Sequence, residues 1–400
     1  MSVNRLVWSN LAAQTAEQIS LAAAPIFAVL YLGAGVGETG FLNFAQTLPF
    51  LLFAIPAGIL ADRFSRVRVM VWAEAMRVCA LLAVLALALA GLLTWPLLAL
   101  LGFVAAGATV AFSVAAPALV PGLVGPAARG AANARIELAR TLAFTAGPAA
   151  GGLLVGWSGA IAAFGCAALL SLVAASLLAG LAEPARVAPT STRHWRSEAQ
   201  AGARFVFGHA MLRPVFVTQF FYGVAFFVLY TAFVPYAVGR LGLAAAGVGL
   251  ILGVYGAGMI CGALAVAALL RRLSLGVVIG IGPVTGFVAS LMMLMTLGVA
   301  QAWLAAASFF LIGFGGIVWV VSTTTLRQAV TPPDLLGRVS AVNILAYGSR
   351  PIGAALGALA GSAFGVEVCL VLATAVFLWQ AIVILVSPVV RLKSQAALAG

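Results

Sequence analysis

Hydrophobic residues lie in long runs along this chain, and the short gaps between the runs hold most of its charged residues. A helix needs about 20 residues to cross the roughly 30 Å hydrocarbon core of a bilayer. Runs of about that length occur at residues 7–32, 39–60, 69–90, 95–120, 134–156, 159–181, 214–238, 247–270, 275–297, 301–322, 340–362 and 366–388. The pattern predicts an all-α integral membrane protein with twelve transmembrane helices.

The composition excludes most other classes of protein. Of the 400 residues, 64% are hydrophobic and 8% are charged, and the mean hydropathy is +1.18. A soluble domain has about 25% charged residues. The net charge of +12 comes from scattered arginines and a single lysine, Lys393, without a clustered basic face, so we expect no nucleic-acid partner. The four cysteines lie far apart inside hydrophobic runs, without metal-ligand spacing: Cys79, Cys166, Cys261 and Cys369.

The longest polar gap, residues 182–213, divides the chain near its middle. We therefore predict an N-terminal six-helix bundle (1–181), a cytoplasmic linker (182–213) and a C-terminal six-helix bundle (214–400). The part from Trp195 to Phe207 is either an amphipathic helix lying on the membrane or a solvated linker. In the helix, the side toward lipid would comprise Trp195, Ala199, Gly202 and Phe205 or Val206.

The distribution of basic residues supports twelve spans. If both termini are cytoplasmic, seventeen basic residues fall in inside segments and only Arg240 falls in an outside loop. The positive-inside rule predicts such a bias, and dropping one span would destroy it. We expect both termini on the cytoplasmic side of a bacterial inner membrane.

A weak internal repeat relates the two halves. Asn133 and Arg140 recur as Asn343 and Arg350, at an offset of 210 residues. The same offset relates a pair of glycines in each half: Gly147 and Gly151 with Gly357 and Gly361. Duplicated halves are typical of one large class of secondary transporters.

The gap between the second and third runs reads Gly58-Ile-Leu-Ala-Asp62-Arg63-Phe-Ser-Arg66. It resembles the signature loop of the major facilitator superfamily, Gly-x-Leu-Ala-Asp-Arg-x-Gly-Arg-Arg/Lys. The match departs at Ser65, where the family usually has Gly, and at Val67. The resemblance implies two six-helix bundles that transport a solute.

The fifth run contains Gly147-Pro148-Ala-Ala-Gly151-Gly152. Proline permits a bend in a membrane helix, and small residues permit close helix contact. Exporters of the superfamily often carry Gly-Pro-x-x-Gly-Gly here, and it is associated with proton-linked antiport. The preceding glycine of that motif is Ala143 in this chain, and an ordinary packing motif is the alternative interpretation.

The wider pattern resembles drug and siderophore exporters of the superfamily, including the enterobactin-exporter-like group. The resemblance rests on Arg129 to Asn133 before the fifth run and on Gly337-Arg338-Val339 before the eleventh. Many proton-linked drug exporters have an arginine in span four, whereas residues 95–120 here carry no charge. Their coupling mechanism is therefore not transferred to this chain.

Charged residues inside spans cost roughly 2.5–3.5 kcal/mol each on insertion scales, so each needs an explanation. Glu74 with Arg77, and Glu137 with Arg140, are spaced i, i+3 and share a helix face. We expect both pairs to form a cytoplasmic gate that breaks when that side opens, or else to be static local pairs. The loop residues expected in this gate are Asp62, Arg63 and Arg66.

Glu17 lies in the middle of the first run, beside Gln14 and Gln18, and the run has no cleavage pattern of a signal peptide. A carboxylate removed from water can exchange protons near neutral pH, so we predict Glu17 as the coupling or cation-recognising group. The alternative is an acid that fixes helix packing, paired with Arg350. Arg350 either compensates Glu17 or binds an anionic group of the substrate.

Further candidates for the lining of a central cavity include aromatic side chains with a polar end, which suit amphipathic organic substrates. They are Gln46, Gln219, Tyr222, Tyr230, Tyr255 and Trp319. For each candidate, packing in the core or against lipid is the alternative interpretation.

The leading hypothesis is a monomeric, proton-linked exporter of small amphipathic organic compounds, embedded in membrane lipids. The alternatives are a lysolipid or lipid transporter of the same fold and a non-transporting scaffold or receptor. An importer of a hydrophilic nutrient would show more polar cavity residues. An enzyme is not expected because no nucleophile–base arrangement occurs. We expect no cofactor and no metal, and the absence of a GxxxxGK[ST] loop argues against ATP as energy source.

Overall fold

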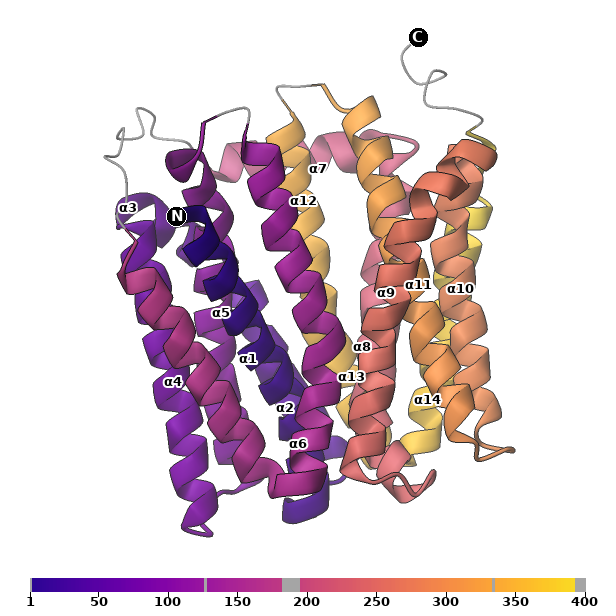
Figure 1. Ribbon diagram of the computed structural model, residues 1–400. Coiled ribbons are helices and arrows are strands. Elements are labelled where there is room, and N and C mark those ends of the chain that lie inside the picture. Colours follow the sequence, from indigo (N-terminus) through magenta and orange to yellow (C-terminus); the bar gives the residue numbers. More distant parts are fainter. Residues whose placement is uncertain (1, 126–127, 182–194, 333–334, 393–400) are drawn as a thin grey trace. The chain divides into compact units, whose positions relative to one another are not determined.

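The computed structural model describes residues 2–125, 128–181, 195–332 and 335–392, and this part of the chain is helical without any strand (Figure 1). The helices in the first half of the chain are α1 (Ser2–Leu32), α2 (Val36–Leu52), α3 (Ala54–Arg63), α4 (Arg66–Leu89), α5 (Trp95–Leu123), α6 (Arg129–Ala179) and α7 (Trp195–Gly208). Those in the second half are α8 (Leu212–Gly239), α9 (Ala245–Arg272), α10 (Leu275–Met295), α11 (Ala302–Val330), α12 (Leu336–Leu345), α13 (Ser349–Phe364) and α14 (Val366–Leu385).

The predicted all-α membrane fold is confirmed, although the helices do not map one to one onto the twelve runs. Nine helices of the described residues are long and apolar enough to cross a membrane. One of them, α6, is 51 residues long and contains two predicted spans that join at Gly159, where φ is 78°. Two other predicted spans are each divided into two shorter helices.

Both divided spans break just before a proline. The run 39–60 is split into α2 and α3 at Phe53, and the run 340–362 is split into α12 and α13 by a 3₁₀ turn at Ala346–Gly348. Pro56 and Pro351 are each the third residue of the helix that follows. Proline has no N–H and is tolerated in a first helical turn, so a break three residues earlier relieves its conflict with the preceding helix.

The chain divides into two compact units. Unit 1 comprises Met1–Thr190 and Val234–Gly253, and unit 2 comprises Ser191–Phe233 and Val254–Gly400. The end of α8 and the beginning of α9 therefore pack with unit 1, which the hydropathy pattern did not suggest. Residues 182–194 of the expected linker lie outside the described residues.

The internal repeat is also a repeat of helix packing. In unit 1, a Cβ placed on Gly147 would lie 2.4 Å from Cβ of Gln18, so α6 and α1 touch there without a side chain between them. In unit 2, a Cβ on Gly357 would lie 3.3 Å from Cα of Val228, where α13 meets α8. The offset of 210 residues relates Gly147 to Gly357. A glycine at equivalent positions therefore allows a close helix contact in each unit.

The helix α7 corrects one expectation from the sequence. We expected Gly202 and Val206 either to face lipid or to belong to a solvated linker. Instead, a Cβ on Gly202 would lie 2.6 Å from the carbonyl oxygen of Arg338 in α12. Val206 is buried in a core that includes Val339. The lack of a side chain at Gly202 thus allows two helices of unit 2 to pack closely.

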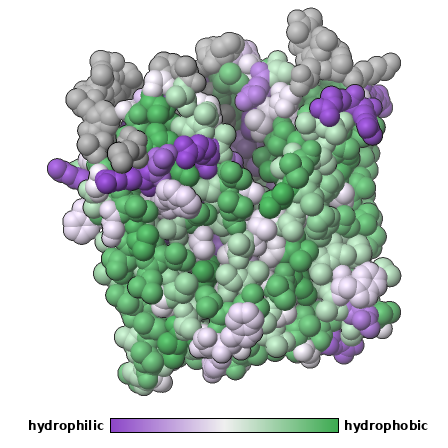
Figure 2. All heavy atoms as spheres, viewed as in Figure 1, coloured by the Kyte–Doolittle hydropathy of each residue, from purple (hydrophilic) through white to green (hydrophobic). Residues whose placement is uncertain are grey.

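Large apolar side chains are exposed along the long helices, and the surface in Figure 2 is mostly hydrophobic, with hydrophilic residues near the top of the view and at its lower right. Trp157 and Leu264 are each 78% exposed. Soluble monomers rarely expose large continuous apolar surfaces, whereas helices in lipid do. The protein is therefore an integral membrane protein.

Candidate functional site

A polar stripe on α1 faces other helices of unit 1. Gln14 and Gln18 are buried, and the Asn10 side chain donates a hydrogen bond of 3.2 Å to the carbonyl oxygen of Ile136 in α6. Glu17 is half-buried and is the middle residue of α1. At 1.5 Å per residue it lies about 22 Å from either end of the helix. The helix begins five residues before the predicted start at residue 7.

The Gly-Pro segment of α6 packs on two helices with two different sides. Gly147 contacts Gln18, and a Cβ on Gly151 would lie 2.9 Å from the carbonyl oxygen of Ile19 in α1. On the other side, a Cβ on Gly152 would lie 2.4 Å from Cα of Gly249 in α9. Pro148 is buried inside the helix. The glycines of this segment therefore bring the backbone of α6 into contact with the backbones of α1 and α9 within unit 1.

Glu74 and Arg77 form an ion pair of 2.9 Å that is shielded from solvent, with both side chains at most 2% exposed. The Arg77 guanidinium also donates 2.7 Å to the hydroxyl of Thr109 in α5 and 3.0 Å to the carbonyl oxygen of Ala13 in α1. The buried Ser171 hydroxyl of α6 lies beside the Glu74 carboxyl group. Hydrogen bonds of this buried charge pair thus join α4 to α1 and α5.

Glu137 and Arg140 are in a different environment. Their side chains are 62% and 51% exposed and 3.8 Å apart, and Arg140 lies over the ring of Phe144 at 5.5 Å. Within the described part of the chain, no hydrogen bond or ion pair joins this pair to Glu74 or Arg77. The structure therefore does not bring the two predicted gate pairs together.

Ser65, where the signature loop departs from the family pattern, has a structural role. Ser65 is the N-cap of α4, and its hydroxyl accepts a hydrogen bond of 3.2 Å from the backbone N–H of Arg68. A capping hydroxyl satisfies a helix N–H that a glycine would leave open. Arg66 donates to the carbonyl oxygen of Ala118 in α5, whereas Arg63 is exposed. The side chain of Asp62 lies outside the described residues.

Unit 2 contains a half-buried aromatic cluster that the sequence did not reveal as a whole. The ring of Phe226 lies 5.7 Å from that of Tyr230 and 5.6 Å from that of Tyr255. Phe227 lies 5.3 Å from Phe226, and the guanidinium of Arg350 in α13 lies 5.8 Å from the Phe227 ring. We call these five residues the aromatic–Arg350 cluster.

Phe226 and Phe227 were missed from the sequence because only aromatic side chains with a polar end were expected to line a cavity. The signal was present, however. Tyr222, Phe226 and Tyr230 are spaced i, i+4 and i+8 and therefore share one face of α8.

The remaining cavity candidates have packing roles in the structure. The Tyr222 hydroxyl donates a hydrogen bond of 3.1 Å to the carbonyl oxygen of Ile312, and Trp319 lies in a hydrophobic core of unit 2. Gln46 is buried against Gly102, where α2 meets α5. Gln219 is half-buried on α8.

Outside the spans, His209 lies in the turn between α7 and α8. Burial lowers the pKa of this imidazole from its usual value. Its Nδ1 accepts a hydrogen bond of 3.2 Å from the backbone N–H of Met211, which requires an unprotonated Nδ1. Among the described residues, no three His, Cys, Asp or Glu side chains form a group that could hold a metal ion.

Solved transporters share this fold. A nucleoside transporter, NupG, superposes with a TM-score of 0.75 at 12% identity, covering 96% of this chain and 99% of that one. A bacterial homologue of the iron transporter ferroportin, in an inward-facing state, gives 0.71 at 16% identity over 95% and 98%. A bacterial homologue of the human lysosomal transporter Spinster gives 0.70 at 16% identity over 96% and 98%. These identities establish the fold alone.

No curated protein matches the sequence. The model of the Major Facilitator Superfamily matches residues 6–358, which confirms the prediction made from the signature loop. The chain therefore belongs to the Major Facilitator Superfamily and is a membrane transporter rather than an enzyme.

Proposed function

We propose that this transporter exports small amphipathic organic compounds, drug-like or siderophore-like, in exchange for protons. The observation that carries the substrate class is the aromatic–Arg350 cluster of unit 2. Its aromatic rings are half-buried rather than sealed in a core. Alternating access of the two six-helix halves around a site at mid-membrane is the transport mechanism of this class of fold.

The chemistry of the cluster fits molecules with an aromatic or apolar body and a polar or anionic group. Ring faces stack on apolar and aromatic surfaces, and the tyrosine hydroxyls provide hydrogen bonds. Arg350 provides one positive charge beside these rings. A guanidinium recognises carboxylates and other anions through a planar set of donors. A hydrophilic nutrient would find few polar partners on such a surface.

Glu17 is the proposed coupling group. Among the carboxylates of the spans, Glu74 is held by Arg77 and Glu137 is exposed beside Arg140. Glu17 instead lies half-buried in the middle of α1, within the stripe formed by Gln14 and Gln18. Its neighbourhood includes the Gly-Pro segment, because Gln18 contacts Gly147. Gain and loss of a proton there would change the charge in the middle of α1.

The test uses purified protein in liposomes with an imposed pH gradient. The panel contains aromatic organic anions and cations, a hydrophilic sugar and a lysolipid, each offered on either side of the membrane. Molecules inserted with their cytoplasmic face outward should take aromatic compounds up into vesicles that are acidic inside. This uptake should be lost when the gradient is collapsed.

Two variants separate the two parts of the proposal. Glu17→Gln should abolish acceleration by the pH gradient while leaving substrate exchange, and Phe226→Ala should weaken substrate affinity while leaving the response to pH. Transport of lysolipid without any dependence on pH would support the alternative lipid transporter instead. Failure to move any member of a broad panel would favour a scaffold or receptor.

A further inference from the structure

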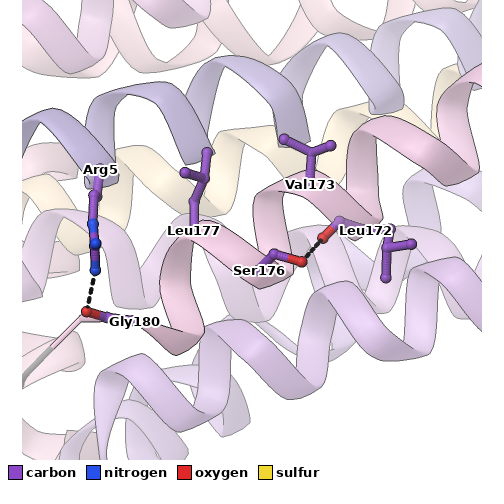
Figure 3. Close-up of a pocket in the computed structure, with 6 residues that line it drawn as sticks. All are labelled: Arg5, Leu172, Val173, Ser176, Leu177 and Gly180. Atoms are coloured by element: carbon purple, nitrogen blue, oxygen red, sulfur yellow. Dashed lines mark hydrogen bonds between the residues drawn. The ribbon is translucent and has the colours of Figure 1, made fainter.

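A surface groove lies where α1 begins and α6 ends, both within unit 1 (Figure 3). It has a volume of about 450 Å³ and is lined by Arg5, Leu172, Val173, Ser176, Leu177 and Gly180. Small-molecule sites typically have volumes of about 300–1,000 Å³, so the groove is large enough for part of an organic ligand. It is independent of the aromatic–Arg350 cluster, which lies in unit 2.

Arg5 gives the groove a positive charge. One Nη1–H of its guanidinium donates 2.6 Å to the carbonyl oxygen of Gly180 at the end of α6. A Cβ on residue 180 would lie 2.5 Å from that Nη1, so the glycine leaves the space that the guanidinium occupies. Arg5 is exposed, and within the described residues its other donors make no hydrogen bond or ion pair. A guanidinium has five N–H donors, and the remaining ones are therefore available to an anion.

The wall of the groove is apolar. Leu172 and Val173 are 52% and 50% exposed, and Leu177 lies on the same helix between Val173 and Arg5 (Figure 3). The Ser176 hydroxyl donates 2.8 Å to the carbonyl oxygen of Leu172, so it is already satisfied by its own helix. Among the described residues, the lining includes no acidic side chain. A matching ligand has an anionic head next to Arg5 and a hydrocarbon chain along Leu177, Val173 and Leu172.

The place of the groove in the membrane identifies the source of such a ligand. Residue 5 is near the start of the first span and residue 180 follows the end of the sixth, so the groove opens where hydrocarbon meets the polar surface. Trp8, one helical turn beyond Arg5, is 60% exposed, and tryptophan is enriched at this level of a bilayer. Arginine near an anionic membrane surface attracts lipid headgroups.

We propose that this groove is a binding site for an anionic phospholipid of the surrounding bilayer. The phosphate binds the free donors of Arg5, and one acyl chain lies on the wall formed by Leu172, Val173 and Leu177. A free phosphate ion has the same charge but lacks the acyl chain, so the apolar wall distinguishes the two.

The test is native mass spectrometry of the purified full chain titrated with phosphatidylglycerol or phosphatidylcholine of equal chain length. Arg5→Gln should lower the preference for phosphatidylglycerol about fivefold, as expected for one arginine at an anionic surface. Val173→Trp fills the groove without changing charge and should reduce binding of both lipids at this site. The matched control is Arg68→Gln, which removes another exposed arginine and should leave the preference unchanged.

Circular dichroism and gel filtration establish that each variant is folded. Unchanged lipid binding in both Arg5→Gln and folded Val173→Trp would overturn the proposal. An equal loss of preference in Arg68→Gln would also overturn it, since the effect would then be one of total charge. Displacement of the lipid by inorganic phosphate alone would show that the apolar wall has no part in binding.

Discussion

The guanidinium of Arg77 in α4 donates a hydrogen bond of 3.0 Å to the main-chain carbonyl oxygen of Ala13 in α1. In an α-helix, the carbonyl oxygen of residue 13 also accepts the N–H of residue 17. Arg77 therefore holds the helical turn that carries Glu17. The same guanidinium is bound to Glu74, so a buried ion pair fixes the backbone at the proposed coupling residue.

This pair should be important for stability. Removing one partner of a buried ion pair typically costs about 3–5 kcal/mol because the other charge remains buried without compensation. We expect Arg77→Met or Glu74→Gln to lower the thermal unfolding midpoint strongly in detergent. In the matched control, Glu137→Gln removes an exposed partner at the same i, i+3 spacing and should cost at most about 1 kcal/mol. Equal losses of stability at the two sites would contradict the prediction that burial makes the Glu74–Arg77 pair the more important one.

Close contact between α6 and α9 should depend on the glycine at position 152. A Cβ there would lie 2.4 Å from Cα of Gly249, so Gly152→Ala forces backbones apart and should destabilise the protein by about 1–3 kcal/mol. Gly165, also in α6, has no neighbouring atom within 4 Å of the place that a methyl carbon would take, and Gly165→Ala should be neutral or stabilising. Thermal unfolding of both variants checks this, and a tolerated Gly152→Ala would show that the crossing adapts easily.

Acidification should weaken the turn at His209. The pKa of this imidazole in the folded protein is below its usual value of 6.5, because burial disfavours the charged form. The unfolded chain therefore binds the proton more readily than the folded protein does. His209 contributes stability above pH 6.5, the usual pKa of the imidazole, and this stability is lost as the pH falls through the lower pKa of the folded protein. Thermal unfolding between pH 7.5 and 5 should show a smaller decline in His209→Asn than in the native chain. An identical decline would assign the pH dependence to other groups.

Replacement of Glu17 should uncouple transport from the proton gradient. Glu17→Gln keeps the size and hydrogen-bonding capacity of the side chain but cannot lose a proton at physiological pH. We expect substrate exchange to persist while the dependence of net transport on pH disappears. Glu367→Gln, which removes an exposed carboxylate in the first turn of α14, is the control and should retain the native pH profile. A native profile in Glu17→Gln would eliminate the coupling role.

Substrate affinity should depend on the aromatic–Arg350 cluster. Aromatic contacts contribute about 0.5–1.5 kcal/mol beyond the area they bury, so Phe226→Ala or Tyr255→Leu should raise KM roughly three- to tenfold for aromatic substrates. Tyr31→Leu changes an exposed ring of unit 1 that stacks on Phe27, and it should leave KM unchanged. If Arg350 binds an anionic group, Arg350→Gln should weaken anionic substrates more than cationic ones. Equal weakening would assign Arg350 a packing role.

The sequence alone determined the membrane environment, the all-helical fold and the superfamily. These properties follow from features that are local in the sequence. The length of each hydrophobic run indicates whether it can cross a bilayer, and the signature loop is recognised from consecutive residues. The breaks before Pro56 and Pro351 were also within reach, because proline conflicts with the preceding turn wherever it occurs.

Tertiary structure alone decided which charges are buried. Glu74 with Arg77 and Glu137 with Arg140 have the same i, i+3 spacing, yet one pair is shielded by α1, α5 and α6 and the other is exposed. Burial depends on which neighbouring helix covers a face, and in runs rich in alanine, glycine and leucine every face has nearly the same hydropathy. The aromatic–Arg350 cluster was hidden for the same reason, since it joins residues from three helices that only folding brings together.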